Sequence, residues 1–260
     1  MPACTLRFLG TAACDFSPLL ATEFRDRYDL DARRSSALLM NGRYLVDAGT
    51  HILDEFRISG EDPARVTDLF LTHFHGDHFN PGAIAKIAAA RPAPLRLWVR
   101  RDAVDPQIPN TEIRRLNEGE ETAVNEDLSV TAVAANHDPA SFPQHFLFAL
   151  NGKRVFYGCD GGWFLNAAWR AMKNKRFDLM VLDGTCGDYT GDFRVAEHNS
   201  VPMIRLLLPS LRTIGATDGN TAIWISHLAP SLHKSHRETE ALLAADGIRV
   251  AYDGATVDIL

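Results

Sequence analysis

Thr72-His73-Phe74-His75-Gly76-Asp77-His78 is the stretch from which the fold and the chemistry of this chain can be read. It follows an apolar run, Leu69-Phe70-Leu71, and it precedes a helix start at Asn80-Pro81-Gly82. In α/β proteins, the segment between a strand end and a helix start is where chemistry is commonly placed. The alternative interpretation is a polar turn that carries surface histidines.

The spacing of these side chains indicates two neighbouring metal ions. His73 and His75 alternate on an extended segment, so they point the same way and can bind one ion. Gly76 lets the chain turn, so Asp77 and His78 can bind a second ion nearby. Neutral imidazoles and carboxylates are ligands for zinc, iron and manganese. The stretch therefore predicts the larger part of a two-metal site.

Composition predicts one well-cored α/β domain over residues 1–260, because the chain has 260 residues with 46% hydrophobic content. Its net charge of -6 and its lack of long Lys/Arg clusters argue against a nucleic-acid partner. No apolar stretch approaches the ~20 residues that span a bilayer, and the N-terminus lacks a signal-peptide core. Cys4, Cys14, Cys159 and Cys186 form no C-x-x-C pair, which favours free thiols. We therefore expect a soluble, cytoplasmic protein without a membrane partner.

Turn and helix signals organise the rest of the chain. Asn41-Gly42 and Asn151-Gly152 lie between apolar runs and predict two hairpins. Asn80 and Pro81 predict a helix from Pro81 to Ala90, and Thr111–Leu116 is predicted as a short helix. Residues 248–252 and 256–260 are predicted as a closing hairpin. The strands form one group that ends near residue 160 and another from residue 177, which suits two face-to-face sheets with helices outside.

Several polar residues leave alternatives open. His137 follows a strand in a loop, whereas His145 begins an alternating strand, which favours His137 over His145 as a further metal ligand. Asp183, at another strand end, either supports the metal site or caps a loop. Residues 11–36 lack periodicity, which is typical of a functional or mobile loop. Within them, Arg33-Arg34 either reaches an anionic substrate or belongs to a solvated charged loop.

The 72–78 stretch resembles the signature of the metallo-β-lactamase superfamily. Four further motifs stand in family order: Asp47 in Leu45-Val46-Asp47-Ala48-Gly49, His137 in Ala135-Asn136-His137-Asp138, Asp160 in Phe156-Tyr157-Gly158-Cys159-Asp160-Gly161, and His227 in Ile225-Ser226-His227-Leu228. The resemblance implies an α/β fold of the four-layer αββα sandwich type. It also implies two divalent cations, zinc or manganese with iron as a third candidate.

The same resemblance assigns the ligands residue by residue. One ion would be bound by His73, His75 and His137, and the other by Asp77, His78 and His227. Asp160 would bridge the two ions, and Asp47 would orient the ligand histidines. An aspartate in the fourth motif, where many β-lactamases have cysteine, argues against lactam hydrolysis.

Three further segments resemble the branch of ribonuclease Z and the PhnP-like phosphoribosyl cyclic-phosphate phosphodiesterases: Leu9-Gly10-Thr11, Glu197-His198-Asn199-Ser200 and Tyr252-Asp253-Gly254. The branch implies attack by a metal-bound hydroxide on a small phosphodiester, cyclic esters included, with His198 as general acid and with Asp77 and Asp47 also in the catalytic set.

A helix-cap role is the alternative for His198. Two features depart from the branch: residues 11–36 hold only Cys14 and so lack the cysteine-rich knuckle of the phosphodiesterases, and the tRNA arm of long-form ribonuclease Z is not evident. With the net charge of -6, the missing arm makes tRNA an unexpected substrate. The alternatives are a lactonase or thioesterase of the same fold and a non-catalytic metal-binding sensing module. The oligomeric state stays open, a homodimer included.

Overall fold

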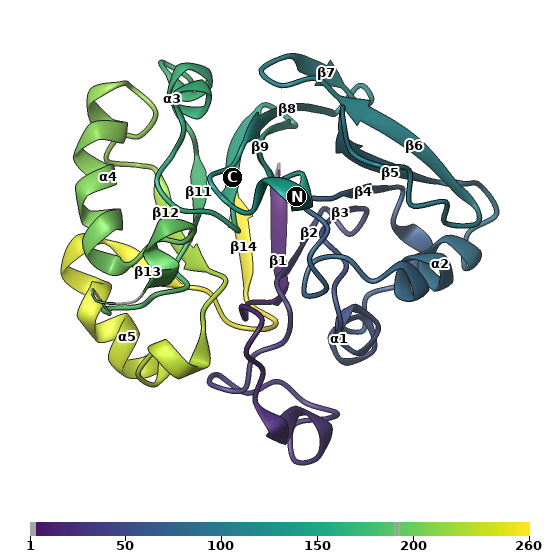
Figure 1. The fold of residues 1–260 in the computed structure, drawn as a ribbon, viewed down its shortest axis with the longest axis horizontal. Coiled ribbons are helices and arrows are strands. Elements are labelled where there is room, and N and C mark those ends of the chain that lie inside the picture. Colours follow the sequence, from purple (N-terminus) through teal and green to yellow (C-terminus); the bar gives the residue numbers. More distant parts are fainter. Residues whose placement is uncertain (1–3, 190, 192) are drawn as a thin grey trace.

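Two mixed β-sheets packed face to face form the centre of the molecule (Figure 1). The computed structural model describes residues 4–189, 191 and 193–260. The first sheet has seven strands in the order β14-β1-β2-β3-β4-β5-β6. Its strands are β1 (Cys4–Gly10), β2 (Ala37–Met40), β3 (Tyr44–Val46), β4 (Asp68–Phe70), β5 (Leu95–Arg100), β6 (Thr111–Leu116) and β14 (Thr256–Ile259).

The second sheet also has seven strands, in the order β13-β12-β11-β10-β9-β8-β7. Its strands are β7 (Glu121–Ala123), β8 (Leu128–Ala134), β9 (Gln144–Leu150), β10 (Lys153–Gly158), β11 (Leu179–Asp183), β12 (Ala222–Ser226) and β13 (Ile248–Val250). In both sheets a run of parallel strands (β3 to β6, and β10 to β13) adjoins antiparallel ones. The carboxyl ends of the parallel strands are therefore available to carry loops with polar side chains.

Helices cover the outer face of each sheet. The helices α1 (Ile52–Ser59) and α2 (Pro81–Ala89) bury their apolar residues with those of the first sheet. The helices α3 (Asn166–Met172), α4 (Val201–Thr213) and α5 (His236–Leu243) do the same on the second sheet. Figure 1 shows these two groups on opposite sides of the strands. The predicted four-layer αββα sandwich is confirmed.

Aromatic side chains fill the space between the two sheets. Phe70 on β4 is fully buried, and its ring centroid lies 5.9 Å from that of Phe146 and 5.1 Å from that of Phe148, both on β9. On the other side of the interface, Phe8 on β1 stacks on Trp224 of β12 at 5.5 Å. Aromatic burial of this kind contributes a large part of the stability of a core. These contacts hold the two sheets at a fixed separation.

The local signals read from the sequence lie where they were expected. Both Asn-Gly pairs form hairpin turns, with φ of 50° at Asn41 and Asn151 and positive φ at the glycines that follow. The Asn80 side chain accepts a hydrogen bond from Ala83 N and caps α2. Among the residues that the structure describes, no helix has the length and apolarity that crossing a bilayer requires.

Two predicted elements are wrong. Thr111–Leu116 is strand β6, because all six of its residues pair in parallel register with β5, and this tertiary pairing overrides the local preference. Residues 248–260 do not form a hairpin. Strand β13 pairs with β12 in the second sheet, whereas β14 pairs with β1 in the first sheet. The predicted division of strands between the sheets is also wrong, because the chain crosses to the second sheet at β7 and returns to the first at β14.

The root of the 11–36 segment is buried, so neither interpretation of its arginine pair holds. Arg33 and Arg34 are only 4% and 1% exposed. Arg33 Nη1 donates to Thr11 Oγ1 at 2.8 Å, and the main-chain N–H of Arg34 donates to Asp253 Oδ2 at 2.8 Å. Arg34 Nη1 also lies 3.7 Å from the same carboxylate oxygen. The arginines therefore attach this segment to the turn between β13 and β14.

Candidate metal centre

Loops from both sheets meet at one end of the sandwich and carry the polar residues of the site. Asp47 follows β3, and the 73–78 turn follows β4. From the second sheet, His137 follows β8, Asp160 follows β10, Asp183 ends β11 and His227 follows β12. Most of these residues lie at the carboxyl ends of parallel strands, which is where α/β sheets place their binding sites.

The structure brings all seven predicted ligand residues together. Three groups each offer side-chain N and O atoms that lie within 4.8 Å of one another, and two of them consist of the predicted ligands; the third is Asp160, Asp183, His198 and His227. The first ligand group is His73, His75, His137 and Asp160, and the second is Asp77, His78, His227 and Asp160. Asp160 belongs to both ligand groups, as expected of a bridging residue.

Unsatisfied nitrogen atoms show that this arrangement fits cations. The Nε2 atoms of His73, His78 and His227 are buried and have no hydrogen-bond partner. They lie 3.6, 3.8 and 3.3 Å from Asp160 Oδ2, respectively. An unpaired buried polar atom costs about 1–3 kcal/mol, so three of them aimed at one carboxylate are stable only with a further partner. Imidazole and carboxylate ligands suit zinc, manganese and iron alike.

The titration behaviour of His73, His137 and Asp160 suits metal binding. Burial lowers the pKa of His73 well below its usual value, and burial also lowers the pKa of His137. Both imidazoles are therefore neutral, the form that binds a metal. Burial would raise the pKa of Asp160, but the imidazoles of His227 and His198 outweigh it and hold this pKa well below its usual range. Asp160 is therefore a carboxylate.

At His78 and His227 burial would lower the pKa, but neighbouring carboxylates outweigh it: Asp77 and Asp47 raise the pKa of His78 to about 10, and Asp160 and Asp183 raise that of His227. These two rings must therefore release a proton when they bind a metal.

Asp47 fixes the orientation of His78. Its Oδ2 lies 2.8 Å from His78 Nδ1, and both carboxylate oxygens accept the Thr72 hydroxyl at 2.9 and 2.8 Å. The Thr72 N–H adds a hydrogen bond of 2.8 Å to Oδ1. These contacts leave His78 Nε2 pointing toward Asp160, as an orienting residue should.

Asp183 does both things that the sequence left open. It caps a loop, because its carboxylate accepts the main-chain N–H groups of Thr185 and Asn199 at 3.0 and 2.9 Å. It also supports the site, because its Oδ2 lies 3.4 Å from His227 Nδ1 and 3.2 Å from His198 Nδ1. The Thr185 hydroxyl, 2.7 Å from His227 Nδ1, is a further support that sequence reasoning missed.

His198 lies in the site and does not cap a helix. Its Nδ1 is 2.6 Å from Asp160 Oδ1, and its ring stacks on that of His227 at 5.6 Å. The cap of α4 is Ser200, whose side chain accepts from Met203 N. The helix-cap alternative for His198 is therefore wrong.

The choice of His137 over His145 agrees with the geometry. His137 Nε2 lies 3.0 Å from His75 Nδ1 and 3.5 Å from Asp160 Oδ2. His145 lies behind the site, where its Nε2 is 3.2 Å from the main-chain oxygen of Asp160. His145 thus supports the Asp160 peptide, a role for which its position at a strand start gave no signal.

The backbone is constrained at three residues of the site. Asp47 and His227 adopt φ values of 64° and 58°, in the left-handed region that disfavours side chains. At Gly49, an added Cβ would lie 1.8 Å from the main-chain oxygen of Asp77. Glycine is therefore required at Gly49 for the loop after β3 to approach the 73–78 turn.

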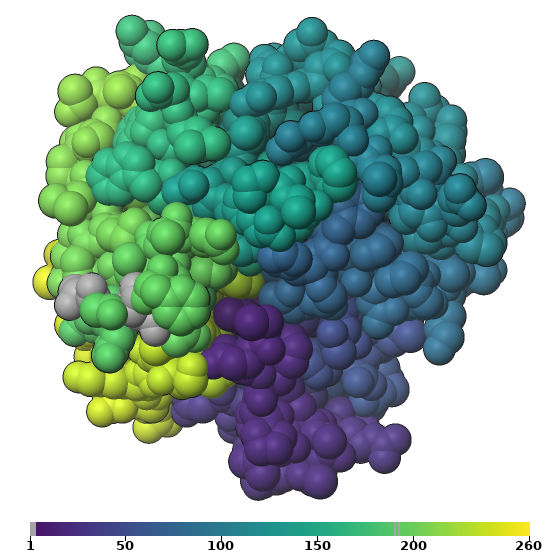
Figure 2. Space-filling model, in the orientation of Figure 1, coloured from purple at the N-terminus to yellow at the C-terminus, as the bar shows by residue number. Residues whose placement is uncertain are grey.

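A cavity of about 410 Å³ opens over the ligand residues and is the candidate substrate site. Besides ligands, it is lined by Cys14, Asp15, Arg194, Glu197 and His198. Figure 2 shows purple, blue, teal and green segments, distant in sequence, meeting on this face. Its size suits a small organic molecule.

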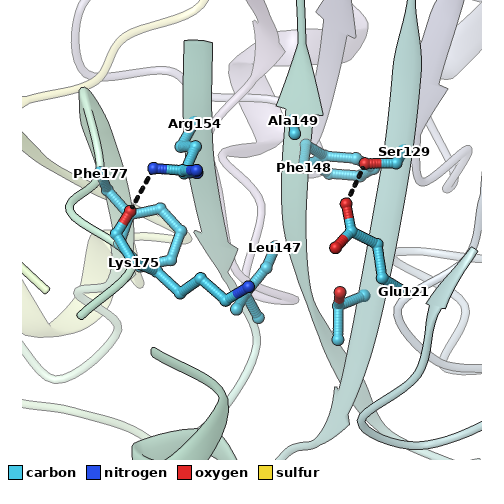
Figure 3. A pocket seen from close by; sticks show the side chains of 9 residues that line it. Glu121, Ser129, Leu147, Phe148, Ala149, Arg154, Lys175 and Phe177 are labelled. Carbon is cyan, nitrogen blue, oxygen red and sulfur yellow. Dashed lines mark hydrogen bonds between the residues drawn. The ribbon is translucent and has the colours of Figure 1, made fainter. Parts of the chain in front are cut away.

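A small cavity away from the metal ligands has no groups that could bind a metal (Figure 3). It measures about 30 Å³ and lies against β8, β9 and β10, with Glu121, Ser129, Arg154 and Lys175 in its wall. None of its lining residues belongs to the groups that could hold a metal. A volume of this size holds about one water molecule.

Comparison with known proteins gives one family and a widely shared fold. The family described as "Beta-lactamase superfamily domain" matches residues 42–200. A ribonuclease Z of Pyrococcus furiosus is 38% identical over 60 residues, which are 23% of this chain and 18% of that protein. The match thus spans less than a fifth of the length of that relative.

Two solved structures share the fold over nearly their whole length. A diphosphatase from the PhnP family has a TM-score of 0.74 at 17% identity, covering 98% of this chain and 97% of its own. Zinc-bound PqqB from Methylobacterium extorquens has a TM-score of 0.72 at 18% identity, covering 98% and 100%.

Proposed function

The chain belongs to the β-lactamase superfamily, a family of metal-dependent hydrolases, and from this premise we propose that it is a binuclear phosphodiesterase acting on a small phosphodiester. The observation that carries the proposal is the shared position of Asp160 between the two ligand groups. The partial match to a ribonuclease Z and the fold shared with a PhnP-family diphosphatase support a phosphorus ester as substrate. The net charge of -6 argues against tRNA.

The ligand assignment follows the two groups. His73, His75 and His137 would hold one ion, Asp77, His78 and His227 the other, and Asp160 both. When bound, two divalent cations neutralise a phosphodiester and make an attacking water more acidic. We expect zinc or manganese, because both accept imidazole and carboxylate ligands.

His198 is the residue proposed to protonate the departing group. Its Nδ1 is held by Asp160 at 2.6 Å and by Asp183 at 3.2 Å. Because the ring also lines the cavity, its Nε2 is left to meet the substrate. As the oxygen of water bonds to phosphorus, one water proton passes to the solvent; the bond to the leaving oxygen breaks, and Nε2 donates its proton to that oxygen.

Asp77 is proposed to orient the attacking water. Its Oδ2 lies 3.4 Å from His78 Nε2 and 3.5 Å from His227 Nε2, and the residue lines the cavity. A carboxylate in this position can accept a hydrogen bond from water and direct its lone pair toward phosphorus.

Metal analysis and a substrate panel test the proposal together. We expect about two metal ions per chain, and hydrolysis of bis(p-nitrophenyl) phosphate in preference to a lactone and a thioester. Asp160→Ala should lose both metal and hydrolysis. Lactone or thioester hydrolysis alone would favour those enzyme classes, and full metal occupancy without turnover of any ester would favour a sensing module.

The proposed cellular setting follows from the cysteines. All four cysteines of the chain are free thiols, which suits a reducing compartment such as the cytoplasm. Fractionation of cells in buffers without added thiol, with an antibody that detects the protein in each fraction, tests this compartment. Sedimentation of the purified protein decides between a monomer and the homodimer.

A further inference from the structure

A second large cavity lies beneath the 15–32 segment, beside the candidate metal centre. It measures about 610 Å³ and is walled by this segment and by Pro230 and Ser231. Asp15 lines both this cavity and the one over the metal ligands, and Ala229 of the latter precedes Pro230 of the former. The two cavities are therefore neighbours, with Asp15 in the wall of both.

The wall of the second cavity is acidic and aromatic. Three aspartates, Asp15, Asp29 and Asp31, line it, and no lysine or arginine does. Asp29 and Asp31 accept main-chain N–H groups at 2.6–2.9 Å. Among the residues that the structure describes, none of the three aspartates forms an ion pair of its own. The buried Arg33 guanidinium offsets part of their negative charge, since Asp31 and Asp29 interact with it electrostatically; three carboxylates against one guanidinium still leave this wall negative.

One carboxylate oxygen of Asp15 has no hydrogen-bond partner. Its Oδ2 accepts the N–H of Ser231 at 3.0 Å, whereas its Oδ1 is buried and has no hydrogen-bond partner. The main-chain hydrogen bond fixes the carboxylate between the two cavities. Because Oδ1 is shielded from solvent, a ligand in the cavity would meet the charge of Asp15 rather than form a hydrogen bond to this oxygen.

Two phenylalanines supply rings to the same wall. Phe16 and Phe24 both line the cavity. The Arg27 guanidinium lies 5.1 Å from the centroid of Phe24, so this ring already accepts a cation within the chain. Carboxylates beside aromatic rings are the chemistry by which proteins bind organic ammonium groups.

We propose that the second cavity is a subsite for an organic cation carried by one ester group of the substrate. The inference rests on the proposed function and narrows its substrate class. The preferred substrate would be a soluble zwitterion, a phosphodiester that also carries an ammonium group. Its phosphorus lies at the metal centre, and its cationic end lies among Asp15, Phe16 and the neighbouring aspartates.

Two esters that differ only in charge test the subsite. They are p-nitrophenyl phosphorylcholine and its carbon isostere, p-nitrophenyl 3,3-dimethylbutyl phosphate. We expect the metal-loaded protein to hydrolyse the choline ester with a kcat/KM about 5- to 30-fold higher, the combined effect of one cation–π contact and one partly exposed ion pair. Using the ratio of the two esters cancels any general change in turnover.

Matched variants assign the preference to the cavity. Asp15→Asn keeps an oxygen for the Ser231 N–H and should bring the ratio to within about twofold of unity, since it removes the charge. Phe16→Leu should lower the ratio as well. Asp105→Asn removes the same charge from an exposed residue that also accepts a main-chain N–H, from Gln107 at 2.8 Å, and it should leave the ratio unchanged.

The outcomes separate the subsite from the function. Hydrolysis of both esters with equal kcat/KM would overturn the subsite and leave the phosphodiesterase intact. Hydrolysis of neither ester, nor of bis(p-nitrophenyl) phosphate, would overturn the function and the subsite together. Faster turnover of phosphatidylcholine vesicles than of the soluble choline ester would overturn the assignment to a soluble substrate.

Discussion

Asp47→Asn removes one negative charge from a fully buried position with almost no change of volume. The new amide can keep its oxygen toward the Thr72 N–H and hydroxyl, which donate at 2.8–2.9 Å in the native protein. Its NH₂ group then faces His78 Nδ1, where Asp47 Oδ2 now lies at 2.8 Å. Two donors face each other, so the imidazole of His78 loses the contact that orients it.

The size of the effect follows from these contacts. Loss of a residue that orients a ligand histidine typically weakens metal binding about 10- to 100-fold, or about 1.4–2.8 kcal/mol. The buried His78 Nδ1–H, left without an acceptor, should also lower the free energy of unfolding of the apoprotein by about 1–3 kcal/mol. We therefore expect weaker metal binding and a less stable apoprotein.

Competition with a chromophoric chelator measures the affinity, and urea unfolding of the apoprotein measures the stability. Asp68→Asn is the matched control, because Asp68 is also fully buried and accepts Trp98 Nε1 at 2.7 Å and Arg96 Nη2 at 2.7 Å. This control should lose stability and keep its metal affinity. Native affinity in Asp47→Asn, or an equal loss of affinity in Asp68→Asn, would refute the orienting role of Asp47.

Three further outcomes are expected. His198→Ala should lower kcat about 10²- to 10⁴-fold and retain both metals, as single-turnover kinetics and metal analysis would show; loss of metal would instead make His198 a ligand. Phe70→Ala should lower the free energy of unfolding by about 3–5 kcal/mol in urea titrations, since its ring packs between both sheets; a loss below about 1 kcal/mol would contradict that packing. Ellman's reagent should titrate one thiol in the native chain and four after unfolding, because Cys14 alone is exposed and burial raises the pKa of Cys4 to about 12. Cys14→Ser should abolish the native reaction, and a remaining fast thiol would show that a buried cysteine is accessible.

Features set by neighbouring residues were predictable from the sequence. The Asn41-Gly42 turn and the Asn80 cap depend on backbone preferences that act within a few residues. The 73–78 turn is also local, because alternation and a glycine are enough to direct its side chains toward the same space. The resemblance to a known superfamily then supplied the distant members of the site.

Features that depend on distant partners were not predictable in the same way. Thr111–Leu116 became a strand only because β5 offers it a parallel edge. Arg33 and Arg34 are predicted from the sequence to be solvated or to contact a substrate. Their buried partner Asp253 lies 219 positions from Arg34 in the sequence, and no local pattern indicates this contact. The supporting roles of His145 and Thr185 have the same origin. Their contacts with Asp160 and His227 exist only once the second sheet has formed.

The left-handed backbone at Asp47 and His227 has a consequence for how this protein can change over generations. A side chain in that conformation costs about 1–2 kcal/mol relative to an ordinary one, so glycine or asparagine at either position would relax the loop. A lineage released from selection for its chemistry should therefore drift at these two positions early, gaining thermal resistance as it loses the reaction. Descendants that keep both aspartate and histidine there would mark the lineages in which the reaction is still needed.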